Sequence, residues 1–431
     1  MLRKFLRYAS NHVLGMLALS CYILADTFFI SVALGANGLT ALNLAIPIYS
    51  FMHGLGLLLG MGGGTRYAIC LGEGRRTEAQ GIFVRIMQLT AVLAALLMLA
   101  GLLCASGLTQ LMQADQQVFG MTKTYIQVIL LFAPGFMMND VLNCFARNDG
   151  APGLAMAAML VSSFSNILLD YLFMFPLKMG IFGAVLATGL ASVLGVLLLV
   201  THLVKKDVGM KLGKSGVSLR AALRTLPLGV PSMVGEVSSG VVMIVFNSII
   251  MRIAGNTGIA AYGVIANLSL VALAVYSGLS QGAQPLISHA KGAGNAGYMR
   301  RILRYEMVSM LGVSVVIGLV IYIFPAQITS IFNSEKNQSL QQMAQTGLKL
   351  YFSGAAAAGA NIVLSAFFSA AALERPSQLI SVLRGFALMI PVAFLLSSLW
   401  GMNGVWLAFP ATEALVMLVA VALYRKYRAR L

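Results

Sequence analysis

The sequence predicts an all-α integral membrane protein with twelve transmembrane helices, arranged as two pseudo-symmetric six-helix bundles around a central cleft. Composition is the first reason: 59% of the 431 residues are hydrophobic and 10% are charged, whereas soluble domains have about 45–50% and about 25%. The second is a series of apolar segments about 20 residues long, the length that crosses a bilayer core of about 30 Å. The third is an internal repeat that relates the two halves of the chain.

The predicted crossings follow one another with short polar connections. The basic start MLRK leads into a full-length apolar segment without a small-residue cleavage pattern after it, so we expect no cleavable signal peptide. An even number of crossings places both termini on the same side of the membrane. The twelve apolar windows lie at approximately 12–34, 40–64, 83–105, 124–146, 152–174, 180–204, 227–251, 258–283, 303–325, 347–370, 378–399 and 403–424.

The distribution of the 29 lysines and arginines predicts on which side of the membrane both termini lie. If the N-terminus is cytoplasmic, all but five of these residues fall on the inner side, in agreement with the positive-inside rule. We therefore expect both termini in the cytoplasm. The formal net charge of +16 then reflects topology and attraction to anionic lipids, which argues against nucleic acid as a partner. The five outer basic residues are Lys123, Lys178, Arg252, Lys336 and Lys349.

A second copy of the same pattern follows after 220 residues. This shift aligns LGANGLTAL with AGNTGIAAY and LGEGR with KGAGN; with a one-residue slip, GIFGAVLA aligns with GMNGVWLA. We expect an N-terminal lobe over 1–204, a cytoplasmic linker over 205–224 and a C-terminal lobe over 225–431. Because each lobe has six crossings, the axis that relates them runs along the membrane normal. The small residues that coincide are Gly35 with Gly255, Gly38 with Gly258, Ala41 with Ala261, Gly62 with Gly282, Gly72 with Gly292 and Gly74 with Gly294.

Four carboxylic acids fall well inside the predicted crossings: Asp26, Asp170, Glu236 and Glu413, whereas Asp140 lies nearer an inner end. An ionisable residue there costs roughly 2.5–3.5 kcal/mol even on a lenient scale, so a functional role is the default hypothesis. At 1.5 Å per residue, Asp26 and Asp170 come to about 21 and 25 Å above the cytoplasmic boundary. Glu236 and Glu413 both come to about 15 Å, and we expect them to face one another in the second lobe.

Other polar residues gather at the depth of Asp26 and Asp170. Asn166 is one helical turn from Asp170 on the same helix face, and Thr188 on the sixth crossing comes to about 18 Å. Two carboxyls, an amide and a hydroxyl make an oxygen-rich site for one Na⁺ ion, or a pair of acids that keeps one proton. The alternative is a cluster of interhelical hydrogen bonds that only holds the bundle together.

No pattern in the sequence indicates a cofactor, a catalytic centre or any metal other than Na⁺. The cysteines form no CxxC motif, and the histidines are explained by helix ends or packed faces as well as by catalysis. The interfacial acids Glu73, Asp149 and Glu374 are interpreted as solvated loop charges. The scattered residues are Cys21, Cys70, Cys104, Cys144, His12, His53, His202 and His289.

Five segments together resemble the multidrug and toxic compound extrusion (MATE) family of cation-coupled exporters, nearest to its bacterial MepA-like and DinF-like members. The similarity extends over nearly the whole chain. The resemblance implies a monomer in the bacterial inner membrane that is not an enzyme. It implies export of diverse, often cationic and amphipathic drugs by alternating access, driven by H⁺ or Na⁺. The segments are DTFFISVALGANGLTALNLAIPI, NCFARNDG, NILLD, GIFGAVLATGLA and HAKGAGNAG.

The resemblance also implies roles for individual residues. The family's coupling positions fall on Asp26, Asn166, Asp170 and Thr188, and Asn143 matches a further asparagine of the pattern. Glu236 and Glu413 are candidates for a substrate site or a second coupling site. Some relatives carry a glutamate on the seventh helix, but it lies about one turn further from that helix's proline than Glu236 does from Pro231.

Two other classes of function remain open on the sequence alone. A flippase for a lipid-linked saccharide has the same general architecture, but it must accommodate pyrophosphate and therefore needs arginine or lysine in the cleft. We place none of the basic residues at mid-membrane. An integral-membrane enzyme would need a His/Asp or metal constellation at an interface.

Overall fold

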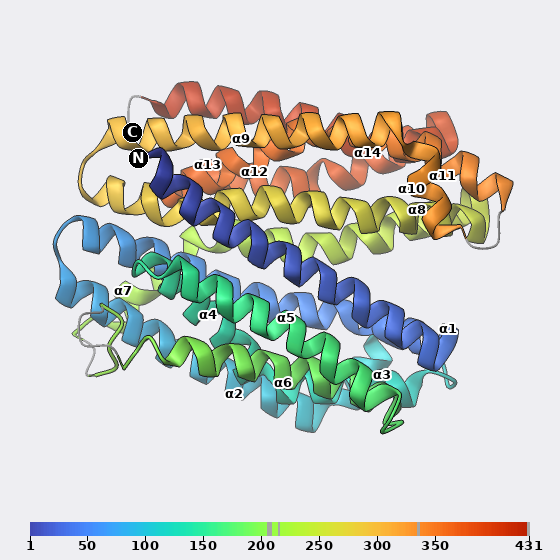
Figure 1. The fold of residues 1–431 in the computed structure, drawn as a ribbon, viewed down its shortest axis with the longest axis horizontal. Coiled ribbons are helices and arrows are strands. Elements are labelled where there is room, and N and C mark those ends of the chain that lie inside the picture. The colour runs from blue at the N-terminus through green and yellow to red at the C-terminus, as the bar shows by residue number, and fades with distance from the viewer. Residues whose placement is uncertain (205–208, 214–215, 334–336, 429–431) are drawn as a thin grey trace.

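The computed structural model describes residues 1–204, 209–213, 216–333 and 337–428. Parts of the predicted linker (205–208 and 214–215), Lys336 and Arg430 lie outside the described residues. Within the described ranges the regular structure is helical throughout (Figure 1). The helices are α1 (Leu2–Gly72), α2 (Arg76–Leu111), α3 (Phe119–Leu131), α4 (Ala133–Asn148), α5 (Pro152–Met174), α6 (Gly180–Val200), α7 (Leu219–Leu223), η1 (Leu226–Leu228), α8 (Val230–Gly292), α9 (Ala296–Ile323), α10 (Pro325–Phe332), α11 (Gln338–Phe352), α12 (Ala355–Ala370), α13 (Glu374–Val382), η2 (Leu383–Ala387) and α14 (Met389–Tyr427).

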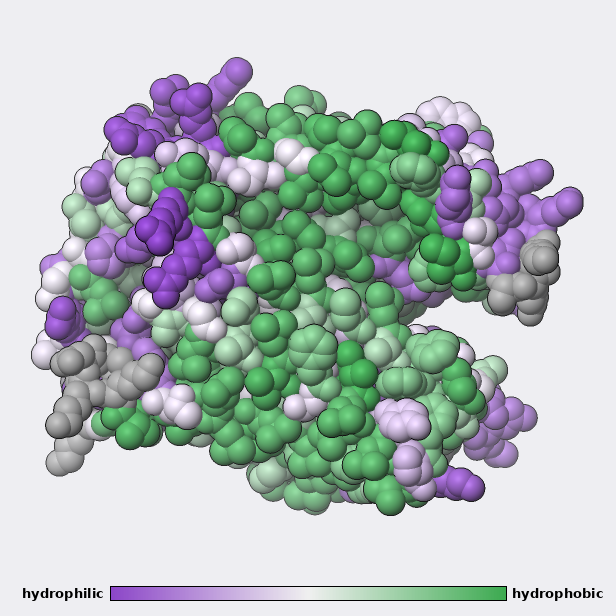
Figure 2. All heavy atoms as spheres, viewed as in Figure 1, coloured by the Kyte–Doolittle hydropathy of each residue, from purple (hydrophilic) through white to green (hydrophobic). Residues whose placement is uncertain are grey.

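These helices provide the twelve predicted crossings. Gly35 divides α1 and Gly255 divides α8 into two crossings each, because both glycines have non-helical backbone angles. Gly401 likewise separates the last crossing from one that begins in α13 and continues through η2 into α14. Two further crossings are bent pairs, α3 with α4 at 50° and α11 with α12 at 44°, and α2, α5, α6 and α9 cross once each. On the face that Figure 2 shows, apolar side chains form a band between two polar ends.

The backbone repeats between the two halves as the sequence alignment predicts. Glycine adopts positive φ at no steric cost, whereas other residues are strained there. Positive φ occurs at matching glycines in both halves, so these chain reversals are made in the same way twice. The matched glycines are Gly35 (62°) with Gly255 (59°), Gly74 (76°) with Gly294 (67°), and Gly180 (60°) with Gly401 (56°).

Two bundles with separate cores form the molecule (Figure 1). One buried cluster draws its residues from Ile30 to Met210, and two others are built almost entirely from the second half. The start of α1 is the exception, because Phe5 and Tyr8 belong to a cluster of the second half, and the Phe5 ring lies 5.8 Å from that of Tyr305. The first helix therefore ties the two bundles together at the end where both termini lie, which we call the terminal end.

Small residues bring the two bundles into backbone contact at the terminal end. A Cβ atom on Gly72 would lie 2.1 Å from the carbonyl oxygen of His289, and one on Gly292 would lie 2.0 Å from that of Ile69. The two contacts are related by the 220-residue repeat, so they are reciprocal. Buried side chains complete the closure: Nη1 of Arg147 lies 2.6 Å from Nε2 of His12, His12 contacts Gln281, and Gln284 bonds Thr65 and Asn148.

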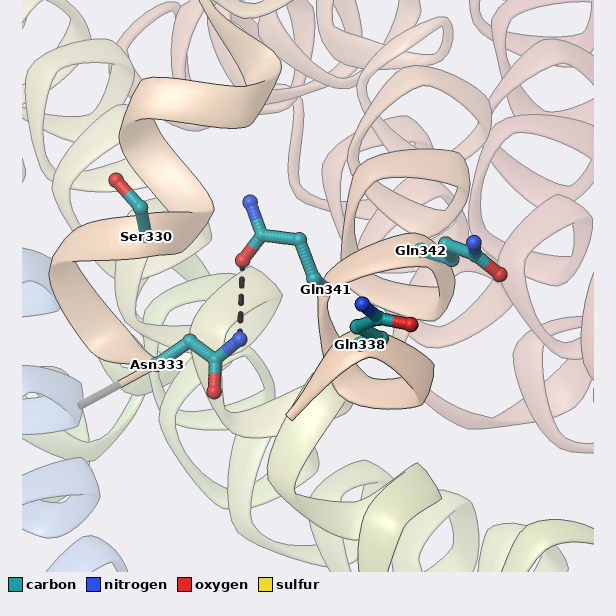
Figure 3. A pocket seen from close by; sticks show the side chains of 5 residues that line it. All are labelled: Ser330, Asn333, Gln338, Gln341 and Gln342. Carbon is teal, nitrogen blue, oxygen red and sulfur yellow. Dashed lines mark hydrogen bonds between the residues drawn. The ribbon is translucent and has the colours of Figure 1, made fainter. Parts of the chain in front are cut away.

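The opposite end is open. Figure 2 shows the two bundles separating there around a hollow. A cavity of about 300 Å³ lined by serine, asparagine and glutamine residues lies at this end between α10 and α11, and Nδ2 of Asn333 donates to Oε1 of Gln341 at 3.2 Å (Figure 3). Because its lining residues carry no ionisable group, it does not resemble a coupling site. The lining residues are Ser330, Asn333, Gln338, Gln341 and Gln342.

Candidate functional site

The two acids predicted at one depth lie in the same buried region of the first bundle. Asp26 belongs to the first crossing of α1 and is 7% exposed, and Asp170 belongs to α5 and is fully buried. Their carboxyls are near enough to interact electrostatically. Two carboxylates that face each other away from water repel strongly, so this arrangement favours a bound proton or cation.

The amide and hydroxyl of the predicted set join the same region. Nδ2 of Asn166, one turn before Asp170, donates to Oγ1 of Thr188 on α6 at 3.2 Å, and Thr188 donates to the carbonyl of Ala184. Both side chains are buried. The structure thus brings four predicted residues together from α1, α5 and α6.

Several buried oxygens of this site lack a partner. Within the described part of the chain, Oδ1 of Asp26, both carboxyl oxygens of Asp170 and Oδ1 of Asn166 accept no hydrogen bond. An unsatisfied buried acceptor costs about 1–3 kcal/mol, and more when it is charged. A proton or a small hard cation would satisfy several of these oxygens at once. Among described residues no group of three or more His, Cys, Asp or Glu side chains could hold a metal, so a site that used Na⁺ would depend on the amide and hydroxyl oxygens as well.

Two tyrosines that the sequence analysis did not select surround the acids. Tyr22 and Tyr125 are both near enough to interact electrostatically with Asp26 and Asp170. Tyr22 is one turn before Asp26 on α1, a spacing that could have identified it. Its hydroxyl lies 3.3 Å from that of Tyr49 in the second crossing of α1.

Asn143 lies apart from this group. Its side chain is buried in α4, and Nδ2 donates to the backbone carbonyl of Ala155 at 3.0 Å. Ala155 precedes Asn166 by eleven residues on α5, which is roughly 16 Å of helix. In this structure Asn143 joins α4 to the beginning of α5.

A second group of ionisable residues lies between the two bundles. We call His53, Asp140 and Glu236 the central group, and Asp26 with Asp170 the acidic pair. Nδ1 of His53 on α1 is 2.8 Å from Oδ2 of Asp140 on α4, and Glu236 on α8 interacts electrostatically with both. The ring of Tyr49 stacks on His53 with centroids 5.9 Å apart. Because Tyr49 also contacts Tyr22, polar side chains connect this central group with the acidic pair.

The central group joins residues that the sequence analysis treated separately. On the sequence, helix ends or packed faces explain His53 at least as well as catalysis does, and Asp140 was placed nearer an inner end; the structure pairs the two side chains. Glu236 interacts with this pair of the first bundle rather than facing Glu413. The useful signal was the presence of a histidine and an aspartate inside predicted crossings, where ionisable residues are rare.

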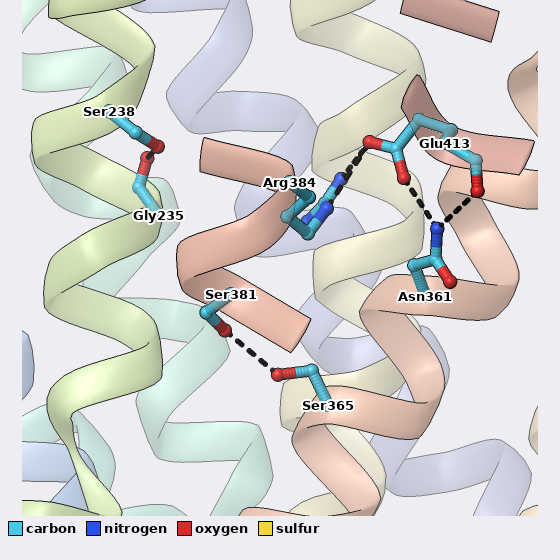
Figure 4. A network of polar contacts seen from close by, with 7 residues as sticks. All are labelled: Gly235, Ser238, Asn361, Ser365, Ser381, Arg384 and Glu413. Atoms are coloured by element: carbon cyan, nitrogen blue, oxygen red, sulfur yellow. Dashed lines mark hydrogen bonds and ion pairs between the residues drawn. The ribbon is translucent and has the colours of Figure 1, made fainter. Parts of the chain in front are cut away.

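Glu413 has a different environment in the second bundle (Figure 4). It is 1% exposed. Oε1 accepts from Nη2 and Nε of Arg384 at 2.8 and 3.2 Å, and Oε2 accepts from Nδ2 of Asn361 at 2.7 Å. Arg384 lies in the π-helical turn η2, so a guanidinium does enter the membrane region. We expected no basic residue at mid-membrane, and this expectation was wrong for Arg384.

Asp149 is not a solvated loop charge. Its side chain is 6% exposed and accepts hydrogen bonds from Tyr67 at 2.6 Å and from the backbone N–H of Gly209 at 3.1 Å. Nε2 of His202 lies 2.9 Å from its second oxygen. Burial, the largest cause, and the nearby Asp149 carboxylate raise the pKa of Tyr67 above its usual value. These contacts attach linker residue Gly209 to the first bundle at the terminal end.

Comparison with known proteins gives consistent results over the whole chain. The profile of the MatE family matches residues 12–172 and 231–395. The multidrug export protein MepA of Staphylococcus aureus strain N315 is 25% identical, and that of Staphylococcus saprophyticus is 24% identical. Each alignment covers 100% of this chain and 94% of the relative.

Solved structures with the same architecture have less than a quarter of their residues in common with this chain. A MATE protein in complex with MaL6 superposes with a TM-score of 0.93 at 23% identity, and 99% of this chain and 95% of that chain are covered. The outward-facing conformation of a multidrug resistance MATE family transporter gives a TM-score of 0.92 at 22% identity, with the same coverage. These likenesses establish the fold.

Proposed function

Because the chain belongs to the MatE family, we propose that it exports structurally diverse, often cationic and amphipathic drug-like molecules from the cytoplasm in exchange for H⁺ or Na⁺. It works as a monomer in the bacterial inner membrane with both termini in the cytoplasm. The relatives named MepA are multidrug export proteins. The observation that carries the coupling proposal is the buried pair of Asp26 and Asp170, in which Oδ1 of Asp26 and both carboxyl oxygens of Asp170 have no hydrogen-bond partner among the described residues.

The coupling ion binds between Asp26 and Asp170. The two carboxyls carry negative charge that the surrounding protein does not neutralise, and Asn166 with Thr188 provides further oxygens beside them. Release of the ion leaves two like charges in a dry site, which favours a rearrangement of α1 against α5. Asn143, which bonds α5 near its beginning, would affect this rearrangement without binding the ion.

The ion is taken up from outside. With both termini in the cytoplasm, closure at the terminal end and the hollow at the opposite end correspond to an outward-open state. One charge that moves down about 150 mV releases roughly 3.5 kcal/mol. That energy could maintain a neutral solute at a gradient of roughly 300-fold if coupling were perfect. For a neutral drug molecule, one ion is therefore sufficient for useful export.

The substrate contacts the central group. Asp140 and Glu236 provide negative charge, and Tyr49 stacked on His53 provides an aromatic surface. A positively charged amphipathic molecule is attracted by both features. Glu413 has no such role in this proposal, because Arg384 and Asn361 already neutralise and satisfy its carboxylate.

The two alternative classes are less well supported. A flippase needs a free cationic group for pyrophosphate, but the guanidinium of Arg384 is engaged by Glu413. An enzyme needs an available nucleophile or metal beside a His/Asp pair, but the pair of His202 and Asp149 is bonded to Tyr67 and Gly209 instead. Members of the family are transporters rather than enzymes.

Dye export from reconstituted vesicles tests the proposal. Ethidium or fluoroquinolone efflux is measured with a pH gradient or a sodium gradient imposed separately, for the wild type and for Asp170→Asn. We expect one of the gradients to drive efflux by the wild type and neither to drive efflux by the variant. Equal efflux by both proteins under both gradients would contradict the coupling site. Complementation of a lipid-intermediate flippase without dye efflux would support the alternative.

A further inference from the structure

We propose that a groove at the terminal end of the C-terminal lobe binds the headgroup of an anionic phospholipid such as phosphatidylglycerol. The groove is a cavity of about 260 Å³ between α9, α12 and α14. It lies outside the acidic pair and outside the central group, and the proposal does not depend on the direction or coupling of transport. The residues that line it are Arg300, Leu303, Arg304, Met307, Leu364, Val421 and Tyr424.

The lining combines the two chemistries of a phospholipid. Residues 300, 303, 304 and 307 lie on one face of α9, because they are three or four positions apart. Arg300 and Arg304 contribute guanidinium groups to this face, and Leu303 and Met307 contribute apolar walls. A guanidinium binds phosphate oxygens through two parallel N–H donors, and the apolar walls can accept the beginning of an acyl chain. Tyr424 also lines the cavity and carries a hydroxyl group that can donate a hydrogen bond.

The positive charge of the groove is not neutralised by the protein. Arg300 and Arg304 are exposed, and in the ranges that the structure describes neither forms an ion pair. Glu306 is on the same helix, but it is fully buried and does not line the cavity. The groove therefore presents two unpaired cations next to apolar surface at the boundary of the membrane region, the arrangement that binds anionic lipid headgroups.

The first lobe differs at the corresponding place. The 220-residue repeat relates Arg300 to Gln80 and Arg304 to Val84, so this lobe has no arginine at either position. The linker covers this surface instead, since Nε2 of Gln80 donates to the carbonyl of Lys211 and Arg85 donates to the carbonyl of Val217. The groove is thus a feature of the second lobe and not a consequence of the repeated architecture.

Native mass spectrometry of the purified full-length chain tests the proposal. The protein is released from micelles that contain equal amounts of phosphatidylglycerol and phosphatidylcholine. We expect the wild type to retain one phosphatidylglycerol molecule in preference to phosphatidylcholine. Each basic residue near an anionic surface adds favourable binding free energy. Loss of two of them, in Arg300→Gln with Arg304→Gln, should weaken this retention about 10- to 30-fold. Gln removes the charge and keeps a polar side chain, and it is the residue at the position equivalent to Arg300 in the first lobe.

A matched control is available on α1. Arg3 and Arg7 are also exposed arginines four residues apart at the terminal end, but they do not line the groove. Arg3→Gln with Arg7→Gln removes the same charge and should leave retention unchanged. Equal losses in the two double variants, or equal retention of both lipids by the wild type, would overturn the site.

Two further measurements separate folding and soluble anions from lipid binding. Val421→Trp fills the groove from α14 without a change in charge, and it should reduce retention while the melting temperature in phosphatidylcholine stays the same. If Val421→Trp retains the lipid as the wild type does, the groove is not the site. Inorganic phosphate should not displace the lipid; displacement would assign the two arginines to a soluble anion and overturn the lipid assignment.

Discussion

Asp170 of the first lobe and Glu413 of the second have opposite environments, although Glu306 of the second lobe is also buried without a hydrogen-bond partner among the described residues. In the first lobe Asp170 is fully buried, and neither of its oxygens accepts a hydrogen bond from the described residues. In the second lobe Glu413 is 1% exposed, and each of its oxygens is bonded, one to Arg384 and one to Asn361. A satisfied acid holds helices in place, whereas an unsatisfied pair requires an ion. We therefore propose that coupling depends on the pair of Asp26 and Asp170 and that Glu413 has a structural role.

This difference lies in side chains and not in the backbone. The reversals at Gly35 and Gly255 have nearly the same angles, 62° and 59° in φ. Two similar scaffolds therefore carry different polar groups. Substitutions in the two acidic sites should therefore affect different properties of the protein.

The largest effect should come from Asp170→Asn. This change removes one of the two acids without a large change in volume, so the ion is no longer held or released. The substrate gradient should fall from as much as roughly 300-fold to none, the value expected for loss of one coupled charge at about 150 mV. Vesicle accumulation assays measure the gradient. The melting temperature should not fall, because an unsatisfied carboxyl is removed. A variant that melts at a lower temperature yet still couples would contradict the proposed role of Asp170.

Substitutions in the pair of Arg384 and Glu413 in the second lobe should mainly affect stability. Glu413→Leu leaves the Arg384 guanidinium unpaired, which costs about 3–5 kcal/mol for a buried pair. Arg384→Leu with Glu413→Leu should be less destabilised than either single variant, since no charge is left alone. Denaturant titration in detergent measures these differences. Glu78 in the first lobe, a partly exposed acid that pairs with Arg66 and Arg75, is the control, and Glu78→Gln should change stability by only about 0–1 kcal/mol.

A smaller effect is expected where the lobes are alike. Gly72→Ala places a Cβ 2.1 Å from the carbonyl oxygen of His289, so it should open the terminal end at a cost of about 1–3 kcal/mol. Spin labels on the two lobes should report a longer distance there. Gly107→Ala is the control, because nothing lies within 4 Å of its Cβ position. An unchanged distance in Gly72→Ala would show that this contact does not close the transporter.

The smallest effect should come from Glu236→Gln. Loss of one negative charge in a partly hydrated cleft should weaken binding of a cationic substrate by about 1 kcal/mol, or about fivefold in KM. KM for a neutral substrate should stay the same, and so should the coupling ratio. Export kinetics for one cationic and one neutral dye separate these outcomes. Equal effects on both dyes would assign Glu236 to the coupling step instead.

Most of the fold could be predicted because it follows from local properties. The length of each apolar segment determines the number of crossings, and the shared glycines, such as Gly35 and Gly255, indicate the repeat. The family resemblance is confirmed by the profile match. The division of the chain at 205–224 stays a prediction.

The candidate site was harder to predict because depth along the membrane normal does not define rotation about a helix axis. Asn166 and Asp170 are one turn apart on one helix, so their common face could be inferred. Glu236 and Glu413 have the same calculated depth, but they point to different surroundings. His53 and Asp140 are on separate crossings, and only the packing of α1 on α4 brings them together.

Calorimetry of drug binding to the purified protein tests the central claim most directly, because the ion displaced by the drug appears in the same measurement. Titrations in buffers of different ionisation enthalpy report protons, and titrations with and without Na⁺ report sodium. We predict that the wild type releases one H⁺ or one Na⁺ per drug molecule and that Asp26→Asn and Asp170→Asn release neither. Release of the same ion by both variants would contradict the assignment of the coupling site to Asp26 and Asp170.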